Sequence, residues 1–120
     1  CDIMLDPLYY GSGNTFYESM AFGTPFITYK YQKSKIPIAG YKQMKICNPP
    51  IASSKADYIN WCKIYSMDKN LLSTTRKDFI EKSNQYLFND NHIYKQYYKF
   101  FNDAVEASKK GKLLNSNWSP

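Results

Sequence analysis

The sequence predicts an α/β fold in which a parallel sheet is followed by several helices. Residues 2–5, "DIML", form a short apolar run that is typical of a buried strand. A glycine-containing loop and a helical stretch from Asn14 or Thr15 to Phe22 come next, and "FITY" at 26–29 is β-branched and aromatic. A strand, a helix and a strand in this order form a βαβ unit, which predicts two parallel strands.

The boundaries of these first elements carry recognisable stop signals. Asp6-Pro7 ends the first strand, because a residue that precedes proline is pushed towards extended or turn geometry. Gly23 is placed where the residue after a helix adopts a positive φ. The polar segment 30–35 predicts a loop, with Ser34 as the N-cap of a helix that reaches about Lys45. Residues 51 and 52 predict a short third strand.

Three further helices are expected in the second half of the chain, and Ser54, Asp68 and Asp90 are their predicted N-caps. Gly111 ends the last helix, and residues 112–120 predict a loose tail. We therefore expect one domain over 1–110 and a tail over 111–120. The inner faces follow helical spacing: Tyr58, Trp61, Cys62 and Tyr65; Leu72, Thr75, Phe79 and Ser83 to Tyr86; Ile93, Tyr97, Phe100, Phe101 and Ala104.

Composition narrows the class of protein. Hydrophobic residues make up 43% and aromatic residues 18% of 120 residues, which is typical of a globular chain with one core. No apolar run approaches the roughly 20 residues of a membrane helix. The net charge of +6 could favour nucleic acid, but only Arg76 of the 16 basic residues is arginine. Reading of base edges favours arginine, so nucleic acid is a disfavoured partner.

The cysteines and the start of the chain suggest context. Cys1, Cys47 and Cys62 are odd in number and lack metal-ligand spacing, which disfavours a disulfide framework or a zinc site. This usage suits a reducing, cytoplasmic compartment. A buried strand at residue 1 needs neighbours to cover it, so we expect a C-terminal fragment of a larger protein with an incomplete sheet.

The stretch "GSGNTFYESMAFGTP" at 11–25 is the candidate ligand site. It lies where the first strand ends and a helix begins, the edge at which open α/β sheets bind ligands. Backbone N–H groups in the first turn have no partner inside the helix, and the helix dipole adds positive charge there. Gly11 and Gly13 would let an anion approach the backbone, while Asn14 and Thr15 add donors. Glu18 lies one turn along from Asn14, where a carboxylate could accept bonds from ribose hydroxyls.

A second interpretation of the same residues needs no ligand. Thr15 and Glu18 have the spacing of a capping box, in which the two side chains satisfy free N–H groups of the helix. The glycines would then be turn residues. The chain would be a non-catalytic helical scaffold or an interaction domain. Spacing alone leaves both interpretations open.

The segment "DIMLDPLYYGSGNTFYESMAFGTPFIT" resembles the nucleotide-sugar-binding segment of the O-GlcNAc transferase and SPINDLY group of glycosyltransferases. The resemblance continues through "SKIPIAGYKQMKI" and "PPIASSKADYINWCKIYSMDKNLLSTTRKDFIEKSNQYLFND" to the closing aromatic helix. It spans about residues 1–107, and the first 28 residues are its most specific part.

The resemblance implies the C-terminal, Rossmann-like half of a GT-B glycosyltransferase. It implies inverting, metal-independent transfer of a sugar from a nucleotide diphosphate, as in GlcNAc from UDP-GlcNAc, to a Ser or Thr hydroxyl of a protein. The expected partners are the UDP-sugar donor, the acceptor protein and the missing N-terminal half of the same enzyme. Neither a membrane nor a cofactor is among them.

The resemblance also assigns roles to individual residues. Gly13, Asn14 and Thr15 would face the diphosphate, and Glu18 would hold the ribose hydroxyls. Lys35 stands where many members have arginine. The phosphate-binding lysine and candidate general base of the family correspond to positions before residue 1. We therefore expect no catalytic residue in this chain, and we expect the fragment alone to be inactive.

Overall fold

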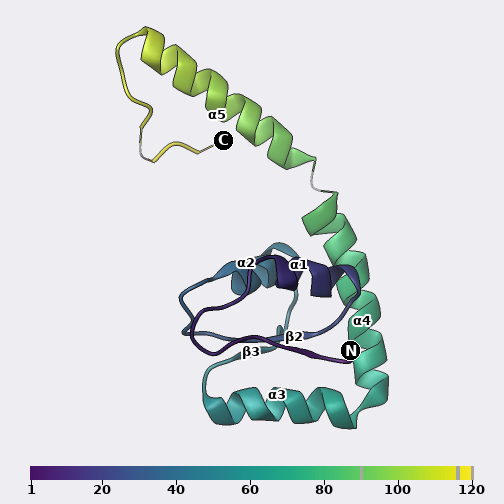
Figure 1. The fold of residues 1–120 in the computed structure, drawn as a ribbon. Coiled ribbons are helices and arrows are strands. Elements are labelled where there is room, and N and C mark those ends of the chain that lie inside the picture. Colours follow the sequence, from purple (N-terminus) through teal and green to yellow (C-terminus); the bar gives the residue numbers. More distant parts are fainter. Residues whose placement is uncertain (90, 116, 120) are drawn as a thin grey trace. The chain divides into compact units, whose positions relative to one another are not determined.

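The computed structural model describes residues 1–89, 91–115 and 117–119, drawn in Figure 1. The chain forms two compact units, Cys1–Asn89 and Asp90–Pro120. The first unit contains the sheet and its covering helices, and the second contains one long helix and the C-terminal segment.

The first unit is a mixed α/β structure, which confirms the predicted class. Its parallel sheet has the strand order β1-β2-β3, with Met4 beside Phe26 and Thr28 beside Ile51. The small open sheet is compatible with a fragment of a Rossmann-like fold. The elements are β1 (Met4–Leu5), α1 (Asn14–Ala21), β2 (Phe26–Tyr29), α2 (Ile36–Gln43), β3 (Ile51–Ala52), α3 (Lys55–Met67), α4 (Lys69–Ser83) and a π-helical segment, η1 (Asn84–Phe88).

Helices cover both faces of the sheet. Figure 1 shows α1 and α2 on one face and α3 on the other. Phe26 and Ile27 are fully buried neighbours on β2 and point to opposite faces, since side chains alternate along a strand. Phe26 packs with Phe16, Met20, Tyr41, Met44 and Phe79, whereas Ile27 packs with Tyr65 and Leu72. Burying one such large apolar side chain contributes about 1.5–3 kcal/mol.

A tyrosine side chain takes the place of a strand beside β2. The Tyr41 hydroxyl accepts a hydrogen bond from the Phe26 N–H at 3.0 Å and donates one to the Phe26 carbonyl at 2.8 Å. Complete burial holds the pKa of Tyr41 well above its ordinary value, because the charged form would lose its water. Tyr41 therefore satisfies both backbone groups of Phe26.

Most predicted helix ends are confirmed. Ser54 and Asp68 cap α3 and α4 by accepting bonds from Asp57 N–H and Leu71 N–H. Gly23 follows α1 with a φ of +65°. The predicted cap Asp90 lies outside the described residues.

The prediction for Ser34 was wrong. The N-cap of α2 is Lys35, and the helix ends at Gln43. The Ser34 N–H donates to the Tyr10 carbonyl at 2.8 Å, and its Oγ accepts only a long bond, 3.5 Å, from the Ile36 N–H, so this residue belongs to the loop that crosses the end of β1. The chain leaves the helical region at Lys45, whose φ is +56°.

The second unit contains α5 (His92–Lys109) and a segment that folds back on it. The Trp118 ring packs edge-on against Phe100 at 5.3 Å, and its Nε1–H donates to the Asp103 carboxylate at 2.9 Å. Gly111 follows α5 with a φ of +67°, as predicted. Within the part of the chain that the structure describes, no helix is both long enough and apolar enough to cross a membrane.

Candidate functional site

The candidate site lies at the start of α1, where the loop after β1 leads into the helix. Gly13 is the N-cap residue, and within the described chain no side chain caps this end. Thr15 is already the second residue of the helix, so it cannot be an N-cap. The predicted capping box of Thr15 and Glu18 is therefore not formed. The Phe16 N–H bonds to the Gly13 carbonyl at 3.1 Å, and the N–H groups of Asn14 and Thr15 have no partner among the described residues.

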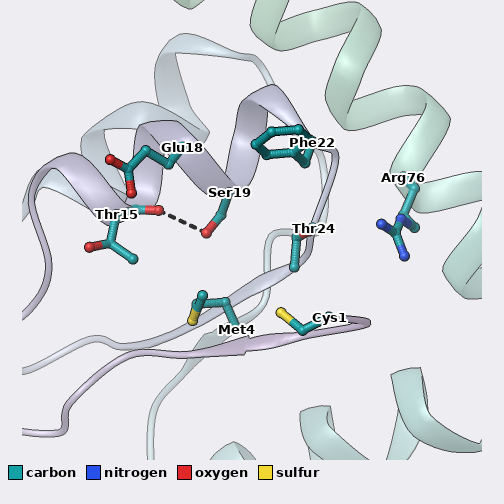
Figure 2. A pocket seen from close by; sticks show the side chains of 8 residues that line it. All are labelled: Cys1, Met4, Thr15, Glu18, Ser19, Phe22, Thr24 and Arg76. Carbon is teal, nitrogen blue, oxygen red and sulfur yellow. Dashed lines mark hydrogen bonds between the residues drawn. The ribbon is translucent and has the colours of Figure 1, made fainter.

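Two of the four predicted site residues line one cavity of about 260 Å³, and Figure 2 shows them on α1. Thr15 and Glu18 lie one turn apart, which places them on the same face of the helix. Gly13 and Asn14 do not line this cavity. The lining residues are Cys1, Met4, Thr15, Glu18, Ser19, Phe22, Thr24 and Arg76.

The carboxylate of Glu18 is available to a ligand. The residue is exposed, and among the described residues its side chain has no hydrogen-bond or ion-pair partner. By contrast, the buried Ser19 donates its hydroxyl bond to the Thr15 carbonyl at 2.7 Å, the dashed line in Figure 2. The Ser19 hydroxyl is therefore occupied by a bond within α1, whereas Glu18 lines the cavity and makes no bond to the described residues.

Arg76 is the residue that the sequence analysis missed. It reaches the cavity from α4, and Figure 2 shows it at the end opposite Thr15 and Glu18. Its Nη1 lies 3.4 Å from the Asp2 carboxylate, and its side chain is 35% exposed. A signal was present: Arg76 lies between Leu72 and Phe79 at the helical spacing of buried positions.

The two glycines of the loop differ in what surrounds them. A Cβ at Gly11 would lie 2.7 Å from Gln32 Oε1 and 3.0 Å from the Ser34 carbonyl, and φ is +81° there. The close approach at Gly11 is therefore made by the chain itself, which corrects the expectation that it serves a ligand. At Gly13 a Cβ would meet only Ile36 Cδ1, at an ordinary 3.8 Å.

A buried carboxylate fixes the loops that follow β1 and β2. Asp6, 2% exposed, accepts bonds from the Ser12 N–H at 2.8 Å and the Ser12 hydroxyl at 2.7 Å. The Thr28 hydroxyl donates to its other oxygen at 2.7 Å. Gln32 belongs to the same network, because its Oε1 lies 2.9 Å from the Thr28 hydroxyl as a second acceptor and its amide donates to the Pro7 carbonyl. The sequence pattern indicated only that Asp6 ends the first strand.

The remaining sequence candidates lie elsewhere. Lys35 Nζ donates to the Lys30 carbonyl at 2.7 Å, so this lysine braces its own loop. Cys62 packs against the core cluster that contains Tyr65, and burial raises the pKa of its thiol. Among the described residues, no group of three His, Cys, Asp or Glu side chains could hold a metal ion.

Comparison with protein-family models, with curated proteins and with solved structures finds no match for this chain.

Proposed function

We propose that this chain is the nucleotide-sugar-binding part of a glycosyltransferase of the O-GlcNAc transferase and SPINDLY type. One observation carries the proposal. Thr15 and Glu18 lie one turn apart on a helix that begins at the carboxyl end of a parallel strand, and both line a single cavity. The Glu18 carboxylate has no partner among the described residues.

The donor diphosphate would bind at the start of α1. The N–H groups of the first turn and the positive end of the helix dipole favour an anion at this position. Gly13 adds no side chain that would obstruct it, and Asn14 and Thr15 are exposed donors. Glu18, one turn further, would accept hydrogen bonds from the two ribose hydroxyls.

The proposed reaction is inverting transfer of a sugar, with GlcNAc from UDP-GlcNAc as the first candidate, to a Ser or Thr hydroxyl of a protein. The part played by this chain is electrostatic. Donors at the start of α1 would stabilise the negative charge that develops on the departing diphosphate. A protein acceptor, a GT-B partner domain and a cytoplasmic location belong to the same proposal. No residue of this chain is assigned as the general base.

The proposal is tested by calorimetric titration of the chain with UDP, UDP-GlcNAc and 2′,3′-dideoxy-UDP. Glu18→Ala should weaken UDP binding by about tenfold or more, because hydrogen bonds to a charged acceptor are lost. The same variant should leave binding of the dideoxy analogue unchanged, since that analogue has no ribose hydroxyls. Glu81→Ala, which removes an exposed carboxylate from α4, is the matched control.

Two results would oppose the proposal. Absence of UDP binding at millimolar concentration would favour the scaffold interpretation. If Glu18→Ala weakened the binding of UDP and of the dideoxy analogue equally, Glu18 would not contact the ribose hydroxyls.

A further inference from the structure

A second cavity, of about 340 Å³, lies at the carboxyl edge of the sheet. Residues at the end of a strand, or in the segment after it, line this cavity, and all three strands contribute. Leu8 and Tyr9 follow β1, Tyr29 ends β2 and is followed by Tyr31 and Lys33, and Lys55 begins the helix after β3. Open α/β sheets bind ligands at this edge. None of these residues lines the cavity beside α1.

Aromatic side chains form the walls of this second cavity. The rings of Tyr29 and Tyr31 lie 5.6 Å apart at 71°, so they form a corner. Tyr9 is 80% exposed and Tyr31 is 67% exposed, although both are large side chains. A flat ring could stack on one tyrosine of the corner and meet the edge of the other, which are the preferred arrangements of aromatic pairs.

The charge of the cavity is positive. Lys33 and Lys55 line it, and no carboxylate is among its described lining residues. Neither lysine has an acidic partner in the part of the chain that is described. A phosphate monoester carries about 1.5 to 2 negative charges at neutral pH, which matches two ammonium groups.

Backbone hydrogen bonds hold the cavity in place without a ligand. The Lys33 N–H donates to the Tyr9 carbonyl at 3.2 Å, which joins the segments after β1 and β2. The Lys30 N–H donates to the Ala52 carbonyl at 2.8 Å and joins the segment after β2 to β3. Gln32, 2% exposed, bonds to Pro7 beneath this loop. Preformed cavities of this size are typical of small-molecule sites.

We propose that this cavity binds a small phosphorylated aromatic compound, with its planar ring against the tyrosines and its phosphate between Lys33 and Lys55. This site is separate from the donor site proposed on α1. The shared chemistry is a flat ring that carries a phosphate monoester. A nucleoside monophosphate and an aryl phosphate are two sources of that chemistry.

The test is a set of calorimetric titrations of the full chain with AMP, O-phosphotyrosine, adenosine and inorganic phosphate. We expect AMP or O-phosphotyrosine to bind at least tenfold more tightly than adenosine and inorganic phosphate, and the tighter of the two identifies the source. Lys33→Gln should weaken this binding about tenfold, through loss of a charge-assisted bond. Tyr31→Leu should weaken it about fivefold, through loss of stacking.

Matched controls separate the site from general attraction to a basic protein. Lys63→Gln and Tyr94→Leu remove an exposed lysine and an exposed tyrosine that do not line the cavity, and both should leave binding unchanged. Glu18→Ala should also leave it unchanged, whatever its effect on UDP. Circular dichroism checks that each variant is folded.

Three outcomes would overturn the inference. The first is that neither AMP nor O-phosphotyrosine binds at millimolar concentration. The second is that inorganic phosphate binds as tightly as the ring-bearing compounds. The third is that Glu18→Ala abolishes binding while Lys33→Gln does not, because the ligand would then belong to the cavity beside α1.

Discussion

Replacement of Asp6 by alanine should destabilise the first unit far more than replacement of an otherwise similar aspartate. Asp6 accepts two bonds from Ser12 and one from the fully buried Thr28. Asp57 likewise accepts bonds from the N–H and the hydroxyl of one serine, Ser53, but at the surface. The two variants therefore compare the same local bonding pattern in buried and exposed settings.

The expected loss of stability in Asp6→Ala depends on whether each donor that loses the carboxylate can bond to another acceptor or to water. The Thr28 hydroxyl would stay buried, but Gln32 Oε1 at 2.9 Å remains as an acceptor, so loss of its bond to Asp6 costs about 0.5–1.5 kcal/mol. Ser12 is partly exposed, so its two donors would regain water and cost about 0.5–1.5 kcal/mol each. The sum for Asp6→Ala is about 1.5–4.5 kcal/mol, whereas Asp57→Ala should cost about 1 kcal/mol or less.

The assay is urea unfolding followed by the fluorescence of Trp61, which is partly buried against the core cluster of Ile27, Tyr65 and Leu72 in the first unit. A Trp118→Phe background removes the signal of the second unit. A difference of about 2 kcal/mol between the variants would shift the midpoint by about 0.7–2 M, given the usual dependence on urea. Equal midpoints for Asp6→Ala and Asp57→Ala would refute the claim that the buried network holds these loops.

Three further predictions concern single contacts. Gly40→Ala should cost about 1–3 kcal/mol or more in urea unfolding, because its Cβ would lie 2.2 Å from Phe16 Cε1 in the core; unchanged stability would show that the ring can move aside. Ser54→Ala should cost about 0.5–2 kcal/mol through loss of the α3 cap, and threonine at this position should restore most of it. The hydrogen bond from Trp118, and then Lys99, lowers the pKa of Asp103 below 3.8, so this contact is complete above that pH and is lost as pH falls through the lowered value. Trp118 fluorescence in a Trp61→Phe variant should therefore change below pH 3.8, and a midpoint above that pH would contradict the sign.

The sequence predicted those elements that short-range chemistry determines. The bounds of β2 were predicted correctly because β-branched and aromatic residues lie between Pro25 and a polar loop. The caps of α3 and α4 were found because Ser54 and Asp68 bond to N–H groups only three residues away. Such signals lie within one turn of chain and need no knowledge of the fold.

The residues that line the two cavities could not be predicted from the sequence, because segments distant in the chain meet there only in the folded structure. Arg76 meets α1 from a helix that lies more than fifty residues further along the chain, so no local pattern could show that it joins Thr15 and Glu18. The capping box of Thr15 and Glu18 was predicted wrongly because α1 begins earlier than a cap at Thr15 requires. The helix begins at Asn14, and this start moves Thr15 from the cap into the first turn. Asp6 looked like a strand terminator because its partner Thr28 is distant in sequence.

The two hydrogen bonds of the Tyr41 hydroxyl limit how far β3 can shift along β2. This hydroxyl occupies the stretch of β2 that β3 leaves uncovered, and Pro49 and Pro50, which precede β3, have no N–H to offer in its place. A shift of β3 along β2 would displace the Tyr41 hydroxyl and leave the N–H and the carbonyl of Phe26 buried without hydrogen-bond partners. The Tyr41 side chain therefore favours the observed register of β3 against β2.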